Sequence, residues 1–251
     1  MRILLIDNSN SRTKFALGGG RGLDDGWRGR LETPEVCRAS LDELLAVSSF
    51  DAVACASVVP EKAEVIRSYF GEGSVPTHFI GPGSPLGMDI DYPQPAQIGA
   101  DRLANAVGVV ARHGAPAVVI DFGTAVTFDV ISSKPAYCGG VIAPGLGAMS
   151  GYLTRRTALL PEVDLAEPRS AIGKSTAEAM RVGAVTGYRG LVRGIIEAVL
   201  REMEGTPVII ATGGDAGLIS DTLPEITACD PDVTLDGIRR IALAAFAGSG
   251  L

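Results

Sequence analysis

The chain has 251 residues, a formal net charge of −7 and a hydrophobic fraction of 46%. This length suffices for one large domain or two compact ones, each with a buried core. The negative charge argues against a sequence-independent grip on nucleic acid, which requires clustered Lys and Arg. It does not exclude an anionic small molecule, because a few local cations and N–H groups suffice to bind one. With only His78 and His113 present, a His-rich metal site is excluded.

Four cysteines are scattered along the chain without a C-x-x-C pair, namely Cys37, Cys55, Cys138 and Cys229. This pattern favours buried free thiols in a reducing compartment. The first apolar run ends at Asp7 and is too short for a signal peptide. No uninterrupted apolar stretch reaches the length of a membrane span. We therefore expect a cytoplasmic protein without a membrane partner.

Two stretches more than a hundred residues apart share one pattern, at residues 4–15 and 118–129. In each, an apolar run ends in Ile-Asp, and small polar residues lead to a second β-type run, which predicts strand, tight turn and strand. Small residues let backbone N–H groups approach a phosphate, and the Asp can hold a cation that neutralises phosphate oxygens. An ordinary surface hairpin explains either copy alone equally well. The repetition favours a duplicated nucleotide-handling fold.

Between these hairpins the sequence predicts the elements of an α/β domain. They are a loop with a weak strand near Trp27 (18–32), a helix capped by Thr33 (33–47), a strand (52–59), a helix (61–70) and a short strand (78–80). The Pro/Gly-rich segment 81–97 is long enough to suggest a functional or disordered loop. It carries Tyr92 and leads to Asp101 and Arg102 at a helix start, where anions are favoured. For Asp101, the local pattern alone favours a plain helix cap.

The second half predicts a similar set of elements after its hairpin. They are a strand (137–142), a Gly-rich loop opening a helix (143–149), a long helix from Ser175 or Thr176 to about Glu204, a strand (208–211) and an apolar helix (237–247). Glycines recur in the long helix at 183, 187 and 190, which we attribute to close packing. The order predicts two α/β domains of similar design, residues 1–115 and 116–251, with a cleft to which each contributes one hairpin.

These motifs, in this order, resemble those of the type III pantothenate kinase family over nearly the whole chain. The family's D-x-G-N-T-x-x-K motif is similar to residues 7–14, with Ser9 in place of Gly and Ser11 in place of Thr. Its G-x-D-R and D-x-G-T-A motifs match residues 99–102 and 121–125. Later stretches also match, namely G-G-x-I-x-P-G (139–145), R-T-A-x-L-P (156–161), G-x-x-T-x-x-x-M (173–180) and the adenosine loop Thr212-Gly213-Gly214.

The resemblance implies the duplicated ribonuclease H-like fold of the acetate and sugar kinases, Hsp70 and actin (actin-like ATPase fold). It implies ATP-dependent phosphorylation of pantothenate to 4′-phosphopantothenate, the first step of coenzyme A biosynthesis. It also implies a homodimer with the active site near the interface, which Arg155 or Arg156 reaches. Mg²⁺ is expected at Asp7, directly or through water, and a monovalent cation, K⁺ or NH₄⁺, at Asp121.

The same resemblance assigns residue roles. Asp101 becomes the general base. The phosphates of ATP are assigned to Asp7, Asn8, Ser9, Asn10, Ser11, Arg12, Thr13, Lys14 and Thr124, and pantothenate to Tyr92, Gly99, Ala100, Asp101, Arg102 and Thr176.

Ser9 is the departure with the largest expected consequence. If the position requires φ > 0, a serine there costs on the order of 1 kcal/mol, although its hydroxyl can donate to a phosphate oxygen. Two alternatives stay open, a catalytically weak regulatory relative of the same fold and a kinase for another small hydroxy acid. Retention of Asp7, Lys14 and Asp101 speaks against the regulatory alternative, because a pure binder has no need of a base.

Overall fold

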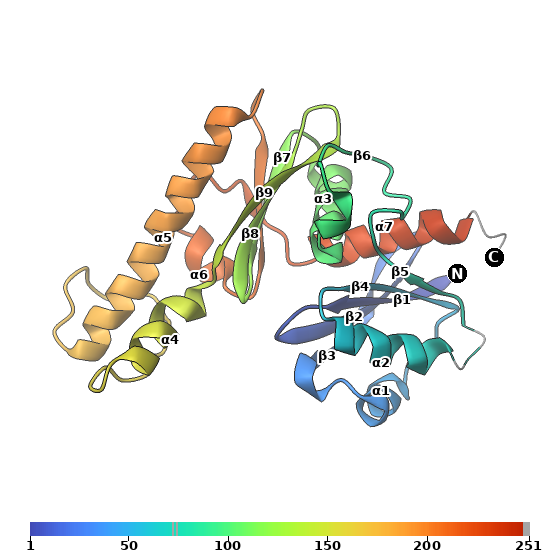
Figure 1. Cartoon of the computed structure of the whole chain (residues 1–251), viewed down its shortest axis with the longest axis horizontal. Coiled ribbons are helices and arrows are strands. Elements are labelled where there is room, and N and C mark those ends of the chain that lie inside the picture. The colour runs from blue at the N-terminus through green and yellow to red at the C-terminus, as the bar shows by residue number, and fades with distance from the viewer. Residues whose placement is uncertain (72, 74, 248–251) are drawn as a thin grey trace. The chain divides into compact units, whose positions relative to one another are not determined.

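The computed structural model describes residues 1–71, 73 and 75–247 (Figure 1). They form two compact units. The first contains residues 1–114, 135–137 and 232 onward, and the second contains residues 115–134 and 138–231. These units differ from the predicted domains 1–115 and 116–251 in residues 135–137 and in the C-terminal helix. The helix groups with the first unit because it packs on a helix and on strands of that unit.

The first unit is built on a five-stranded sheet. Its order is β3 (Gly22–Glu32), β2 (Arg12–Gly19), β1 (Arg2–Asn8), β4 (Ala52–Ser57) and β5 (Thr77–Phe79). β1 pairs antiparallel with β2 and parallel with β4. The weak strand predicted near Trp27 is confirmed, but the loop predicted around it is wrong, because β3 covers Gly22–Glu32 and pairs antiparallel with β2 along most of its length. Its polar residues are partly or fully exposed, so no apolar periodicity marks this strand in the sequence.

Two helices, α1 (Arg38–Leu45) and α2 (Pro60–Gly71), cover one face of this sheet (Figure 1). Alternate residues of β1, Leu4 and Ile6, join Leu41 and Ile66 in one buried cluster there. The predicted start of the first helix is wrong. Residues 33–35 form a separate 3₁₀ turn, and the side chain of Thr33 is bonded to the first hairpin instead of capping a helix.

Two other helices, α3 (Ala100–His113) and α7 (Val233–Ala247), pack closely against each other on the opposite face (Figure 1). A Cβ on Gly237 would collide with the carbonyl oxygen of Ala104, so this contact requires glycine. The hydroxyl of Thr234 donates to Asn105 Oδ1 at 2.6 Å across the same interface. α7 therefore holds α3, and with it the G-x-D-R motif, against the sheet of the first unit.

The second unit repeats this sheet. Its order is β9 (Ala136–Pro144), β8 (Ala125–Ile131), β7 (Ala117–Phe122), β10 (Val208–Gly213) and β11 (Ala228–Cys229). β7 pairs antiparallel with β8 and parallel with β10, as β1 does with β2 and β4. This shared order and orientation confirm the predicted duplication. The first residues of β9 belong to the first unit, where they pair with β6 (Asp89–Ile90).

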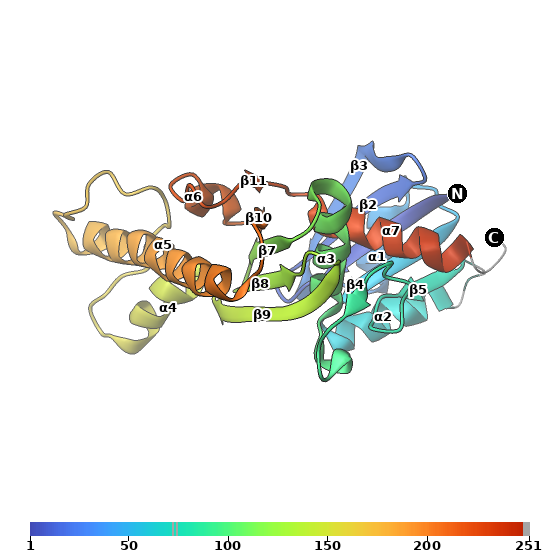
Figure 2. The same ribbon diagram turned by 90° about the horizontal axis from the view of Figure 1, so that it is seen from above.

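The helices of the second unit are α4 (Leu146–Arg156), α5 (Thr176–Glu202) and α6 (Ala216–Ser220). α4 and α5 pack against each other (Figure 2). Ser175 caps α5 as predicted, since its hydroxyl accepts from the Glu178 backbone N–H at 3.2 Å. Close packing of the α5 glycines is wrong within the described chain, because a Cβ at 183, 187 or 190 would meet nothing within 4 Å.

None of the four cysteines, all of which the structure describes, is in a disulfide, but only Cys55 is buried, so predicted burial is wrong for Cys37, Cys138 and Cys229. Burial raises the pKa of the Cys55 thiol. Within residues 1–71, 73 and 75–247, no helix combines the length and apolar character needed to cross a membrane.

Candidate functional site

The first hairpin holds a buried carboxylate next to its turn. Asp7 and Lys14 face each other across β1 and β2, and Lys14 Nζ lies 3.7 Å from Asp7 Oδ2. The Asp7 side chain is only 5% exposed, whereas that of Lys14 is 42% exposed. The hydroxyl of Ser9 donates to the other carboxylate oxygen, Oδ1, at 2.8 Å. A buried carboxylate thus has a hydroxyl donor on one oxygen and a cation near the other.

Ser9 fits the turn without backbone strain. Among the residues that the structure describes, no non-glycine residue has a positive φ. The cost expected if this position needed φ > 0 therefore does not arise. The Ser9 N–H donates to Arg12 O at 3.2 Å, and Ser9 O accepts from the Thr33 hydroxyl at 2.7 Å. The serine is held by its backbone as well as by its hydroxyl.

Further side chains tie this turn to its surroundings. Asn8 Nδ2 donates to Thr13 Oγ1 at 2.8 Å, and Thr13 Oγ1 lies 2.9 Å from Thr33 Oγ1. Ser57, at the end of β4, donates to Asn8 Oδ1 at 2.6 Å. Thr33 and Ser57 were not predicted as site residues, although a hydroxyl residue directly after or at the end of a strand is a usable signal. Asn10, Ser11 and Arg12 are exposed at the tip.

The G-x-D-R motif lies in the same unit and near the same strand end. Val58 follows β4, and its N–H donates to Asn8 O at 3.1 Å. A Cβ on Gly99 would lie 3.3 Å from the Val58 side chain. Val58 therefore links the first hairpin to the start of α3. The structure brings residues 7–14 and 99–102 into one neighbourhood, as a shared phosphate and substrate site requires.

Asp101 lies in the first turn of α3 and is not its N-cap, which is Gly99. Its Oδ1 accepts from the Arg102 backbone N–H at 2.8 Å. The carboxylate thus bonds one of the first helical N–H groups, as the plain capping interpretation expected in part. It remains partly exposed, so a substrate could reach it. Carboxylates are favoured at this end of a helix by the local N–H groups and the helix dipole.

Tyr137 joins two of the predicted substrate residues and was missed by sequence reasoning. Its side chain is 1% exposed. The guanidinium carbon of Arg102 lies 5.7 Å from the centre of its ring. The ring of Tyr92 makes an edge contact with it at 6.2 Å between centroids. All three residues belong to the first unit. Only the tertiary fold reveals this cluster, because Tyr137 lies on a strand far from both partners in sequence.

Three predicted motifs converge at the turn between β7 and β8 in the second unit. The Gly145 N–H donates to Thr124 O at 3.1 Å, and the Asp215 N–H donates to Phe122 O at 3.3 Å. Gly213 has φ +95°, and a Cβ there would collide with the Phe122 backbone and approach Asp121 Oδ1. The D-x-G-T-A turn, the Gly145 loop and the late Thr-Gly-Gly loop therefore form one glycine-lined surface around Asp121 and Thr124.

Thr176 belongs to the second unit, whereas Tyr92 and residues 99–102 belong to the first. A cavity of about 510 Å³ lies beside it, lined by residues 168–170, 172–174, 178, 181 and 182. Arg155 and Arg156 are exposed in the last turn of α4. Neither unit alone contains the whole predicted substrate set.

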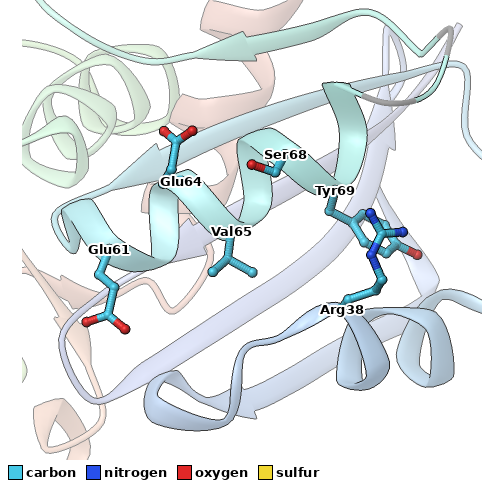
Figure 3. A pocket seen from close by; sticks show the side chains of 6 residues that line it. All are labelled: Arg38, Glu61, Glu64, Val65, Ser68 and Tyr69. Carbon is cyan, nitrogen blue, oxygen red and sulfur yellow. The ribbon is translucent and has the colours of Figure 1, made fainter.

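A second hollow, of about 550 Å³, lies between α1 and α2 (Figure 3). Figure 3 shows Arg38 reaching over the ring of Tyr69, with a guanidinium-to-centroid distance of 5.6 Å. None of the six residues that line this hollow is a predicted site residue. We therefore do not assign it to the reaction.

Comparison with known proteins is decisive for the family. A family model described as type III pantothenate kinase matches residues 3–198. A protein of Akkermansia muciniphila named Type III pantothenate kinase is 53% identical over 96% of this chain and 98% of its own length. A Moorella thermoacetica protein of the same name is 40% identical over 95% and 98%, respectively. The chain belongs to the type III pantothenate kinase family.

Solved structures agree with the fold expected of the type III pantothenate kinase family. MreB 5 of Spiroplasma citri bound to AMPPNP has a TM-score of 0.55 at 11% identity, covering 100% of this chain and 99% of its own. The ethanolamine utilization protein EutJ from Carboxydothermus hydrogenoformans has a TM-score of 0.59 at 15% identity, covering 97% and 90%. These likenesses confirm the duplicated actin-like fold and concern the fold alone.

Proposed function

We propose that the chain transfers the γ-phosphoryl group of ATP to a hydroxyl of pantothenate, giving 4′-phosphopantothenate and ADP. This reaction is the first step of coenzyme A biosynthesis. The observation that carries the proposal is the family match over residues 3–198, a range that includes both hairpins and the G-x-D-R helix. The chain is accordingly an enzyme of the kinase class.

The first hairpin is proposed to hold the transferring phosphate. Phosphoryl transfer depends mainly on positioning and charge neutralisation, and Asp7 and Lys14 supply opposite charges 3.7 Å apart. Kinases commonly hold Mg²⁺ with one or two carboxylates, substrate phosphates and water. Asp7 fits that arrangement, directly or through water, because it places one carboxylate beside the turn of the first hairpin. Mg²⁺ would neutralise phosphate charge, and residues 8–13 would surround the phosphate oxygens.

Asp101 is proposed as the general base. It accepts the proton of the pantothenate hydroxyl while that oxygen attacks the γ-phosphorus and the bond to ADP breaks. A carboxylate in the first turn of α3, partly exposed and tied to Arg102 N–H, suits that role. Arg102 is proposed to bind the pantothenate carboxylate, because guanidinium and carboxylate match in charge and geometry. Tyr92, Gly99, Ala100 and Thr176 complete the proposed substrate site.

The second hairpin is proposed to hold ATP and a monovalent cation. Thr124 would contact the nucleotide, and Asp121 would hold K⁺ or NH₄⁺. Hard cations prefer oxygen ligands, and a carboxylate beside a turn of backbone carbonyls offers them. Support comes from the convergence of Gly145 and Gly213 on this turn, which keeps bulky side chains away from it. The cation would supply positive charge near the nucleotide.

We also propose a homodimer whose active site lies near the interface. Of seven large apolar side chains exposed in the described chain, five lie in the second unit, namely Ile142, Tyr152, Leu153, Leu159 and Ile172. Exposed apolar side chains that form a patch are typical of interaction surfaces, and Tyr152 and Leu153 are neighbours in sequence on α4. Arg155 and Arg156 lie on the same helix as Tyr152 and are proposed to reach the partner's site. A cytoplasmic location is proposed from the free cysteines.

A coupled ADP-release assay with ATP, Mg²⁺ and pantothenate tests the function. We expect turnover that depends on pantothenate and rises when K⁺ or NH₄⁺ replaces Na⁺. Full activity in sodium-only buffer would contradict the proposal that Asp121 holds K⁺ or NH₄⁺. Turnover with a different hydroxy acid, and none with pantothenate, would assign another substrate. No turnover under any condition would favour the catalytically weak regulatory relative.

A further inference from the structure

Tyr137 contacts two proposed substrate residues but has no role of its own in the proposed reaction. It lies at the start of β9, in the short segment 135–137 that groups with the first unit. Its side chain is buried, at 1% exposure, yet two of its contacts are proposed substrate residues, Tyr92 and Arg102. A buried aromatic ring is a rigid support, because packing restricts its rotamers.

The ring contacts restrict both substrate residues. A guanidinium within about 6 Å of an aromatic centroid is attracted by the ring quadrupole, and Arg102 lies at 5.7 Å. A neutral ring can hold a guanidinium without cancelling its charge, which stays available to an anion. Edge-to-face pairs are favourable at centroid distances of about 4.5–7 Å, and the Tyr92 ring lies at 6.2 Å with an interplanar angle of 70°.

The backbone of Tyr137 acts on the same loop. Ile90 in β6 is the strand partner of Tyr137, and the Asp91 N–H donates to Tyr137 O at 2.9 Å. This bond fixes the residue directly before Tyr92. The long Pro/Gly-rich segment is therefore anchored at the point where it presents its aromatic side chain. One residue thus restrains Tyr92 through backbone and ring, and Arg102 through the ring.

We propose that Tyr137 is a positioning residue for the pantothenate site. Its ring sets the guanidinium of Arg102 and the ring of Tyr92 in the arrangement that receives the carboxylate end of pantothenate. The inference rests on the proposed function and deepens it. Tyr137 itself is not a catalytic residue, because it acts through its two neighbours.

The test compares Tyr137→Leu with Tyr137→Phe and a matched control. We expect Tyr137→Leu to raise the KM for pantothenate about tenfold, the combined size of one cation–π and one aromatic contact. The kcat and the KM for ATP should stay within about twofold of wild type. Tyr137→Phe retains the ring and should behave like wild type. The control is Tyr69→Leu, which removes an Arg38–Tyr69 contact of nearly the same length, 5.6 Å, in the same unit.

A second comparison separates positioning from general packing. In an Arg102→Met background, Tyr137→Leu should raise the KM for pantothenate only about threefold, since residues that act through one another are not additive. Thermal unfolding of each variant checks the fold. If Tyr137→Leu fails to fold, Tyr137→Met refills more of the space with a flexible apolar chain, and the same tenfold shift is expected.

Several outcomes would overturn the inference. One is a KM for pantothenate no higher in Tyr137→Leu than in Tyr69→Leu. Another is an equal rise in the KM for ATP, which would indicate a general loss of structure. A wild-type enzyme that does not turn over pantothenate would overturn the proposed function and this inference together. A wild type that does, with an unchanged KM in Tyr137→Leu, overturns this inference alone.

Discussion

The two hairpins occupy equivalent places in their units and are fastened in different ways. In each, Asp is the second-last residue of a central strand, which has an antiparallel partner on one side and a parallel partner on the other. In the first, side-chain hydroxyls hold the turn together with backbone bonds, and Ser9 bonds the carboxylate of Asp7. In the second, backbone bonds from Gly145 and Asp215 hold it.

The difference is consistent with the two tasks that we propose for the hairpins. A turn fastened by side chains fixes the direction of a carboxylate, which suits a small, highly charged phosphate group. A turn surrounded by glycines leaves backbone accessible to a larger ligand. The first unit also contains the G-x-D-R helix, so the proposed chemistry and the fixed carboxylate belong together. The second unit contains the turn that we propose to hold the nucleotide and the cation.

The largest expected effect tests whether the chemistry belongs to the first unit. Asp101→Asn should lower kcat by about 10²–10⁴-fold, because the amide cannot accept the substrate proton. The fold should survive, since an amide oxygen can still accept from the Arg102 N–H. Steady-state kinetics and a thermal melt measure both. Asp221→Asn, an exposed carboxylate of the second unit, is the control. A kcat within about threefold of wild type would remove Asp101 as the base.

The next largest effect compares the stability that one ion-paired carboxylate contributes in each unit. Asp236 in the first unit is buried and accepts from Arg239 at 2.8 Å and Arg240 at 2.7 Å, and Arg239 also donates to Gly19 O. Asp236→Asn should lower the free energy of unfolding by about 3 kcal/mol, because it leaves a buried arginine without its counter-ion. Glu167→Gln in the second unit should cost less, because the Glu167 side chain is 60% exposed in its pair with Arg189, although the Arg189 side chain is only 11% exposed.

The contacts of Asp236 with Arg239 and Arg240 also predict that the free energy of unfolding depends on pH. Burial raises the pKa of Asp236, but the hydrogen bonds and charges of Arg240 and Arg239 outweigh it, and the net pKa lies below 3.8. A lowered folded-state pKa means that the stabilisation is present above the ordinary value and is lost as pH falls through the folded value. Unfolding curves between about pH 5 and pH 2 should show this loss in wild type and not in Asp236→Asn. Parallel curves for the two proteins would contradict it.

The smallest effect probes the hairpin asymmetry directly, by exchanging Ser9 and Gly123. Ser9→Gly should lower kcat about threefold, the size of one hydrogen bond to Asp7. Gly123→Ser should fold, since a Cβ there lies 3.4 Å from Ala125 O and 3.9 Å from Asp121 Oδ1. It should raise the KM for ATP about fivefold by crowding the nucleotide. Ser9→Ala removes the hydroxyl and keeps the Cβ, so it shows which of the two sets kcat. If Ser9→Gly and Gly123→Ser changed the KM for ATP equally, the two hairpins would not differ in nucleotide binding.

Much of the local structure at the candidate site was predictable from local patterns. The two Asp-bearing strands, the α3 start at residues 99–102 and the Ser175 cap are encoded by neighbouring residues, which is why sequence reasoning placed them. Whether Ser9 is strained depends on its φ, which the sequence does not give. In the structure Ser9 does not have a positive φ. The prediction that the α5 glycines pack closely against another part of the described chain was wrong. The spacing of glycines in a helix does not show which residues, if any, contact that face.

The sequence alone determined the repeated hairpins, the order of motifs and the family, because these depend on contiguous residues. Tertiary structure decided what depends on distant partners. Polar residues 22–32 became a strand only because β2 offers them hydrogen bonds. Thr33 left its expected helix cap for bonds to Thr13 and Ser9. Tyr137 met Tyr92 and Arg102 because β9 carries it there, and α7 joined the first unit because Gly237 permits close contact with α3.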